Sequence, residues 1–219
     1  MPAPDAATGR DMPTIDELVI ADEPARWAAL GFTLDGDVCQ LGQVRVRLAG
    51  PSAGRGIVGW SLRDIVPGPL DGLAPTPSLT HVPVQVSPHP NGIAAIDHVV
   101  AVSPDLQRTV SALTAAGLPL RRIRERPSAT GAPRQAFFRL GDEILEVVQD
   151  PSGTSPPDRP AHLWGLALLA NDLEGTVASL GDRVSETRPA VQPGRRIATV
   201  RPSAGLSVPM ALISRRRGT

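Results

Sequence analysis

The sequence predicts an α+β fold made of tandem strand–helix–strands modules. Its 219 residues include 21 Gly and 24 Pro, which is too many for a helical bundle and typical of short strands joined by turns. Several segments alternate apolar and polar residues, as half-buried strands do. In addition, short matches recur in the same order in both halves, which indicates a duplicated chain.

The first half is expected to begin with a strand and a short helix. Pro24 suits the first turn of this helix, because its missing N–H is not needed there, and Gly31 ends it. A single helical turn is expected over residues 70–73. The strands of this half are expected over residues 15–21, 38–41, 44–48, 57–65 and 81–86.

The second half repeats this order with clearer signals. One helix, capped by Asp105 or Ser103, runs to Ala116 and stops at Gly117. Another helix is expected over residues 173–180. The strands are expected over residues 96–102, 120–126, 135–140, 144–149, 163–169, 197–201 and 208–213.

Three internal matches support the duplication. In chain order, residues 15–19 match 96–100, residues 40–42 match 139–141, and residues 60–62 match 164–166. The predicted organisation is a disordered extension (1–12), a compressed first copy (13–87), a linker (88–94), a second copy (95–214, with modules 95–150 and 162–214) and a basic tail (215–219).

The composition excludes several functional classes. All 22 basic residues are Arg and they balance 22 acidic residues, so a general nucleic-acid binder and Schiff-base chemistry are not expected. The single cysteine, Cys39, excludes an internal disulfide and a multi-cysteine metal site. The sequence has neither a secretory signal nor an apolar run long enough to span a membrane, so we expect a cytoplasmic protein.

The module over residues 95–150 resembles a known family. A strand carrying His98, a helix introduced by Ser-Pro-Asp-Leu (103–106) and a closing Ile-Leu-Glu-Val-Val (144–148) are similar to the βαβββ unit of the glyoxalase/bleomycin-resistance/extradiol-dioxygenase group, the vicinal oxygen chelate superfamily. The resemblance is fair over residues 162–213 and weaker over 14–86. It implies curved, cup-shaped mixed sheets with flanking helices.

The resemblance also implies a metal site on the first and last strands of a module. Here those positions carry His98 and Glu146, which suit one divalent ion of Zn, Fe, Ni, Co or Mn. The partner module offers Gly165 and Ala211, which cannot ligate, so the protein can also lack a metal altogether. In the first copy, Glu17 occupies the His98 position.

Further side chains are candidates for binding a substrate. Gln135 and Arg139 share one face of a strand, and Arg195 and Arg196 lie in a turn that precedes another. Arginine binds carboxylates through two parallel hydrogen bonds. Trp164 is a candidate for an apolar wall. The ordinary alternatives are solvated arginines and a core tryptophan.

Three functional hypotheses follow. The first is a metal-dependent lyase, isomerase or dioxygenase that acts on a small oxygen-rich or carboxylated molecule in the second cup, with Glu146 as catalytic base if it is not a ligand. The alternative is a metal-free binding or sequestering protein of the bleomycin-resistance type. The third is a structural module whose cup is filled by Met210, Leu212 and Trp164, with His98 as a core histidine. We expect no nucleic-acid or membrane partner, and a homodimer remains open.

Overall fold

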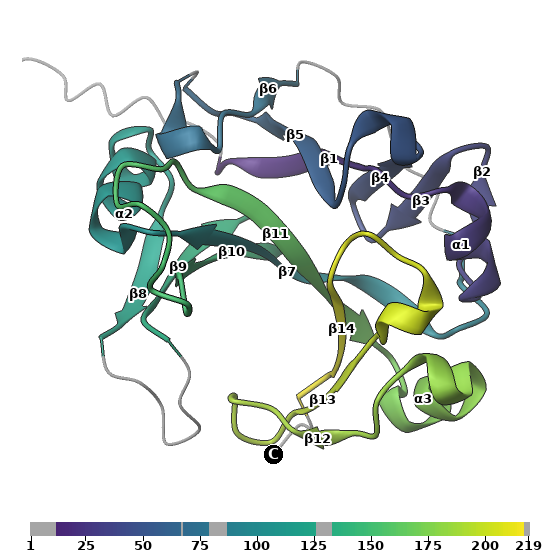
Figure 1. The fold of residues 1–219 in the computed structure, drawn as a ribbon. Coiled ribbons are helices and arrows are strands. Elements are labelled where there is room, and N and C mark those ends of the chain that lie inside the picture. Colours follow the sequence, from purple (N-terminus) through teal and green to yellow (C-terminus); the bar gives the residue numbers. More distant parts are fainter. Residues whose placement is uncertain (1–11, 67, 79–86, 126–132, 217–219) are drawn as a thin grey trace, which may run out of the picture.

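The computed structural model of the protein describes residues 12–66, 68–78, 87–125 and 133–216. The predicted extension over residues 1–12 lies outside the described residues except for Met12, as do the predicted strand over 81–86 and the last three residues of the predicted tail. The described chain forms two open mixed sheets (Figure 1).

The first sheet has six strands in the order β2-β3-β4-β1-β5-β6. Strand β1 lies at the centre, parallel to β4 and antiparallel to β5. Its first module is a complete βαβββ unit, and the described residues of its second module form β5, a short helix and β6. The elements are β1 (Thr14–Ile20), α1 (Pro24–Ala29), β2 (Leu34–Asp35), β3 (Val38–Leu41), β4 (Val44–Leu48), η1 (Pro51–Ala53), β5 (Ile57–Arg63), η2 (Leu70–Gly72) and β6 (Thr76–Pro77).

The second sheet has eight strands in the order β12-β13-β14-β11-β7-β10-β9-β8. The central strands β7 and β11 are antiparallel, and each has a parallel partner, β10 or β14. The elements are β7 (Ile93–Ser103), α2 (Leu106–Ala115), β8 (Leu120–Arg124), β9 (Gln135–Leu140), β10 (Glu143–Gln149), β11 (His162–Ala170), α3 (Leu173–Leu180), η3 (Gly181–Arg183), β12 (Arg188–Pro189), β13 (Arg196–Thr199), η4 (Pro202–Ala204) and β14 (Met210–Ser214). The predicted α+β fold of tandem βαβββ modules is confirmed.

Strand β7 begins at Ile93, inside the segment that the sequence predicts as a linker (88–94). The strand is longer than its apolar pattern suggests because Ile93 pairs with Ala170 at the end of β11. The structure shows which residue caps the start of α2 and which caps the start of α3. The side chain of Asp105 accepts a hydrogen bond from the backbone N–H of Arg108 at 3.0 Å, and Asp172 caps α3 in the same way.

The second sheet curves, and its outer face is the covered one. Figure 1 shows α2, α3 and the first sheet all on the outer side of this curve. Along β7 and β10 the outward residues are completely buried, among them Val99, Ala101, Leu145 and Val147, and they belong to one apolar core that joins both sheets. Because successive strand residues point to opposite faces, the alternate residues line an inner face that remains open to solvent.

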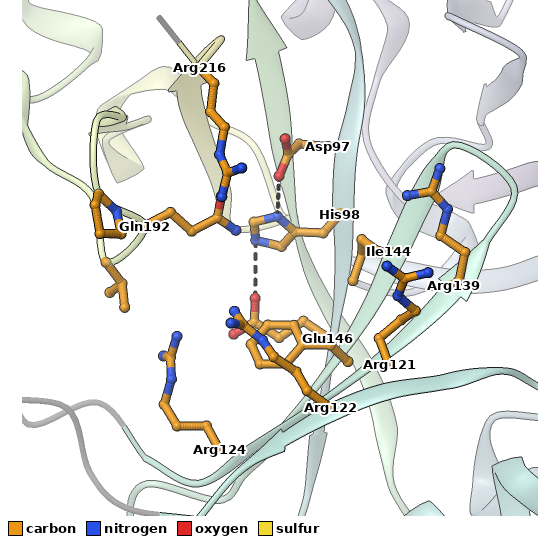
Figure 2. A pocket seen from close by; sticks show the side chains of 13 residues that line it. Asp97, His98, Arg121, Arg122, Arg124, Arg139, Ile144, Glu146, Gln192 and Arg216 are labelled. Atoms are coloured by element: carbon orange, nitrogen blue, oxygen red, sulfur yellow. Dashed lines mark hydrogen bonds and ion pairs between the residues drawn. The ribbon is translucent and has the colours of Figure 1, made fainter. Parts of the chain in front are cut away.

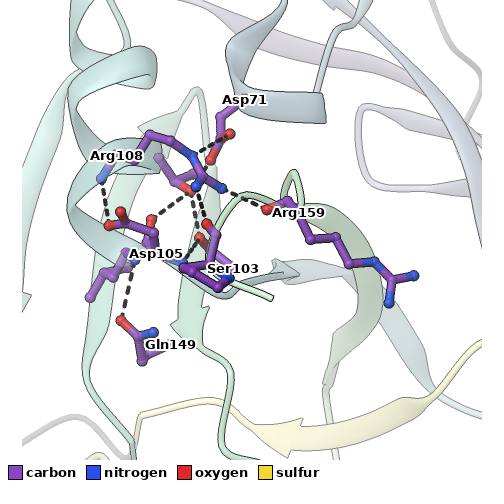
Figure 3. A network of polar contacts seen from close by, with 9 residues as sticks. Asp71, Ser103, Asp105, Arg108, Gln149 and Arg159 are labelled. Atoms are coloured by element: carbon purple, nitrogen blue, oxygen red, sulfur yellow. Dashed lines mark hydrogen bonds and ion pairs between the residues drawn. The ribbon is translucent and has the colours of Figure 1, made fainter. Parts of the chain in front are cut away.

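A polar network ties the first sheet to α2 and to the loop that follows β10 (Figure 3). The carboxylate of Asp71 in η2 accepts a hydrogen bond from Nε of Arg108 at 2.8 Å and another from the hydroxyl of Thr109. The Arg108 guanidinium also donates to the carbonyls of Pro157 and Arg159 in the loop. These contacts fix the loop that borders the inner face of the second sheet.

Strand registers correct one of the internal matches. The sequence aligns Trp60 with Trp164, but in the structure Gly59 and Gly165 pair with equivalent residues of β1 and β7. The alignment is therefore wrong by two residues at this point. Both strands contain the same irregularity, in which Val58 is the extra residue of β5 and Trp164 that of β11, so Trp164 is equivalent to Val58 and not to Trp60.

Candidate functional site

A bulge in β7 places two adjacent polar side chains on the inner face. Ile96 and His98 pair with consecutive residues of β11, so Asp97 is an extra residue in its strand. Such a bulge re-aims side chains, and both Asp97 and His98 line the same hollow. The Oδ2 atom of Asp97 lies 2.8 Å from Nδ1 of His98.

His98 faces Glu146 of the neighbouring strand β10 (Figure 2). Its Nε2 atom lies 3.3 Å from Oε2 of Glu146, and the two side chains are 17% and 13% exposed. The side-chain amide of Gln135 on β9 donates a hydrogen bond to the other oxygen of Glu146. The structure thus brings together the imidazole, the carboxylate and the amide that the sequence singled out.

Arg195 lies behind Asp97 instead of reaching into the hollow. Its guanidinium donates to Oδ1 of Asp97 at 2.5 Å, to the carbonyl of Ser214 at 2.7 Å and to the side chain of Gln192 at 3.0 Å. The side chain is 8% exposed. With these donors engaged, Arg195 orients Asp97, and Asp97 in turn orients the ring of His98.

The protonation of this group follows from its surroundings. Burial raises the pKa of Asp97, but the hydrogen bonds from His98 and Arg195 outweigh it, and the net pKa is lowered. An ionised Asp97 assigns a proton to Nδ1 of His98, which leaves Nε2 facing Glu146. Burial raises the pKa of Glu146 against the opposing charge of His98. A proton held by Glu146 can therefore be shared with Nε2.

Arginine side chains dominate the wall around this pair. The hollow has a volume of about 440 Å³, and its lining contains five arginines but only two acids, Asp97 and Glu146. Figure 2 shows the guanidinium groups arranged around His98. Arg122 lies over the ring of Phe137, 4.6 Å from its centroid. The five arginines are Arg121, Arg122, Arg124, Arg139 and Arg216.

Of these five, only Arg139 was among the predicted site residues. It forms a long ion pair of 3.7 Å with the exposed Asp142. Arg121, Arg122 and Arg216 form no ion pair with any residue that the structure describes. The signal that sequence reasoning missed was the Arg-rich strand over residues 121–124, which could have been interpreted as one wall of the cup.

Besides Arg195, two further predicted residues lie away from the His98–Glu146 pair. Arg196 turns toward α3, where its Nε pairs with Glu174 at 2.9 Å. Trp164 lies on the inner face but lines a second hollow further along β7, and it is 48% exposed. Met210 and Leu212 are buried in the core, so they do not fill the cup as the structural hypothesis required.

The residues present do not fit a resident divalent metal. Atoms 3.3 Å apart, such as Nε2 of His98 and Oε2 of Glu146, can share one ion, but they supply only two donors. Gly165 and Ala211 add none, and a Cβ at Gly165 would lie 2.8 Å from the carbonyl oxygen of Pro209. Across the described ranges, no group of three or more His, Cys, Asp or Glu residues is arranged to hold a metal.

A hollow of about 450 Å³ also lies at the equivalent place in the first sheet, and its charged side chains pair with one another. Asp16 is likewise an extra residue in β1, and Glu17 occupies the position of His98. Glu17 pairs with Nε of Arg47 at 3.2 Å, and Asp16 pairs with Arg45 at 3.0 Å. The lining of this hollow contains two arginines and two acids, so of the two hollows it is the one in the second sheet that has an excess of positive charge.

Comparisons with known proteins bear on the fold. No protein-family model matches the sequence, and no curated protein is similar to it. In the described part of the chain, no helix combines the length and apolarity needed to cross a membrane. Methylmalonyl-CoA epimerase from Mycobacterium tuberculosis superposes with a TM-score of 0.46 and 18% identity, over 56% of this chain and 89% of that one. The Streptomyces coelicolor epimerase, in complex with 2-nitronate-propionyl-CoA, gives 0.45 and 21%, over 56% and 97%.

One solved structure matches nearly the whole chain. A xylose isomerase-like TIM barrel/4-hydroxyphenylpyruvate dioxygenase fusion protein superposes over 94% of this chain with a TM-score of 0.62 and 14% identity. This chain spans 50% of the length of that protein. At this identity the likeness concerns the fold, and it includes both sheets. The chain therefore shares its tandem βαβββ fold with that protein, and this is the fold that the sequence resemblance implies.

Proposed function

We propose that the cup of the second sheet binds a small anionic, oxygen-rich molecule directly through its side chains. The observation that carries this proposal is a group of arginines in the wall around His98 and Glu146, none of which forms an ion pair with a residue that the structure describes: Arg121, Arg122, Arg124 and Arg216. A concave site lined by excess positive charge concentrates anions, and guanidinium groups match carboxylate geometry.

Direct binding is favoured over binding through a metal because of the donor set. Two protein donors leave a divalent ion weakly held, and the neighbouring guanidinium groups add repulsion for any cation. The proposal therefore takes the metal-free binding hypothesis in preference to the metal-dependent enzyme.

The His98–Glu146 pair supports a second candidate function, proton transfer to or from the bound anion. Asp97 fixes the His98 ring, and a proton can lie between Nε2 and Oε2 of Glu146, where an entering substrate would meet it. Groups placed in this way act as general acid and base when their pKa lies near the working pH, and burial moves the pKa of Glu146 in that direction.

Calorimetric titration of the purified protein with malonate and with inorganic phosphate, in the presence of a chelator, tests the binding function. We expect saturable binding of at least one probe, and Arg124→Ala should weaken it about 10- to 100-fold, which is the range for a lost charge-assisted hydrogen bond. Arg55→Ala, an exposed arginine outside the cup, is the matched control. Binding that requires an added divalent metal, or that is equally tight in Arg124→Ala, would contradict the proposal.

Proton transfer has its own readout. The protein should accelerate exchange of the methylene hydrogens of malonate for deuterium, followed by NMR, and Glu146→Gln should abolish the acceleration. Malonate that binds without faster exchange would leave the binding function standing and remove the catalytic one.

A further inference from the structure

The inner face of the second sheet changes character along its two central strands. On β7, His98 is followed on the same face by Val100 and Val102, and on β10, Glu146 is followed by Val148. All three valines are only partly buried. The charged cup therefore continues, without a change of face, into an apolar surface.

This apolar surface forms a second hollow, of about 330 Å³. Its floor consists of the three valines, and Trp164 of β11 and the loop over residues 150–155 enclose it. The chain that follows this segment is held at Pro157 and Arg159 by the guanidinium of Arg108. The volume lies in the lower part of the usual range for small-molecule sites, roughly 300–1,000 Å³.

Trp164 is the unusual member of this hollow. The protein has three tryptophans, and the other two, Trp27 and Trp60, are 0% and 4% exposed. Trp164 is 48% exposed because the irregularity in β11 turns it onto the inner face. An indole left half in water beside exposed valines gains stability when apolar surface covers it.

The charged side chains of the two hollows determine the orientation of a ligand that spans them. Hydrogen bonds from Ser155 and Ser152 lower the pKa of Asp150 to about 2, so a carboxylate stands at the edge of the apolar hollow. Burial, and then the nearby charge of Arg159, lower the pKa of His162, which keeps this ring neutral. The lining of the apolar hollow thus contains a carboxylate and no arginine, whereas the cup contains five arginines, so the acid group of a ligand is favoured in the cup.

We propose that the ligand of this protein is an amphipathic acid, whose carboxylate lies in the arginine-lined cup and whose apolar chain or ring lies over Val100, Val102 and Val148 against Trp164. This inference rests on the proposed function and adds the substrate class. Since strands rise by about 3.3 Å per residue, the tail must reach roughly 7–13 Å beyond His98. At about 1.3 Å per carbon, a straight chain of about seven carbons reaches the near end of this range, beside Val100, and about eleven carbons reach Val102.

The test is a titration with acetate, butanoate, hexanoate and octanoate, read by tryptophan fluorescence and by calorimetry. Affinity should rise about four-fold for each methylene buried, and octanoate should shift the emission of Trp164. Trp164→Ala should flatten the chain-length series and leave the affinity for butanoate unchanged. Val58→Ala, an exposed valine in the first sheet (41% exposed), is the matched control.

The outcomes separate the two proposals. If malonate binds through Arg124 but affinity does not rise with chain length, the amphipathic ligand is refuted and the anion site stands. If no probe binds, both proposals fall. Binding of 1-octanol as tightly as octanoate would refute the requirement for an acid. A shift of Trp164 emission with protein concentration alone would show that a second copy of the chain covers the hollow, which also overturns the inference.

Discussion

Replacing Glu143 by glutamine should stabilise the protein at neutral and alkaline pH. Glu143 begins β10, is 4% exposed, and shares the buried face of that strand with Leu145 and Val147. Burial, with a smaller contribution from Asp142, raises its pKa from 4.5 to about 7. Glu146 lies three residues further along β10, so its side chain points to the other face of the sheet, into the cup.

The size and sign of the effect follow from this shift. A carboxyl whose pKa is raised by folding contributes its full stability below the unfolded pKa of 4.5 and loses it as the pH rises through about 7. At 1.36 kcal/mol per pH unit, the loss is about 3 kcal/mol at most. Glu143→Gln stays neutral throughout, so its advantage over the wild type should grow between pH 4.5 and 7 and then level off.

Urea unfolding of both proteins from pH 4.5 to pH 8.5 measures this difference. Glu23→Gln, at an exposed glutamate in the first sheet's module, should show a difference that does not vary with pH. A constant difference for Glu143→Gln, or one that shrinks with rising pH, would refute the argument that Glu143 is desolvated.

Three other predictions test the fold and the site. Asp71→Ala should lower the free energy of unfolding by on the order of 1–3 kcal/mol, because it removes the carboxylate that accepts hydrogen bonds from Nε of Arg108 and from the Thr109 hydroxyl, and urea denaturation should show this. Gly165→Ala should cost about 1–3 kcal/mol in thermal unfolding because its Cβ would be crowded at 2.8 Å, whereas Gly59→Ala, at the equivalent place but with its nearest atom at 3.9 Å, should cost less. Glu146→Gln should bind anions more tightly relative to the wild type as the pH rises, because ionisation of Glu146 adds repulsion only in the wild type, and calorimetry at pH 5 and pH 8 would detect it.

Strand periodicity accounts for the part of the site that the sequence could predict. His98 and Glu146 lie on strands that pair with each other, and alternation alone places both on one face. Gln135 and Arg139 follow from the same rule on β9. This inference needs only the local pattern and the order of elements, which the sequence contains.

The remaining site residues depend on pairings between distant segments. Asp97 reaches the hollow because β11 pairs irregularly with β7, and Arg195 is drawn to Asp97 from 98 residues away. Trp164 is exposed for the same kind of reason. None of these side chains carries a local signal, since a bulge is decided by two strands together.

The two sheets show how one scaffold gives one hollow with balanced charges and one hollow with an excess of positive charge. Both have an extra aspartate before the key position of the central strand, and both place a charged residue opposite it. In the first sheet, Glu17 faces Arg47, and the pair neutralises itself. In the second sheet, His98 faces Glu146. The lining of that hollow contains five arginines and only two acids, so its charges do not cancel. The capacity to bind an anion thus arises from an incomplete cancellation of charge at equivalent positions, and the fold alone does not determine it.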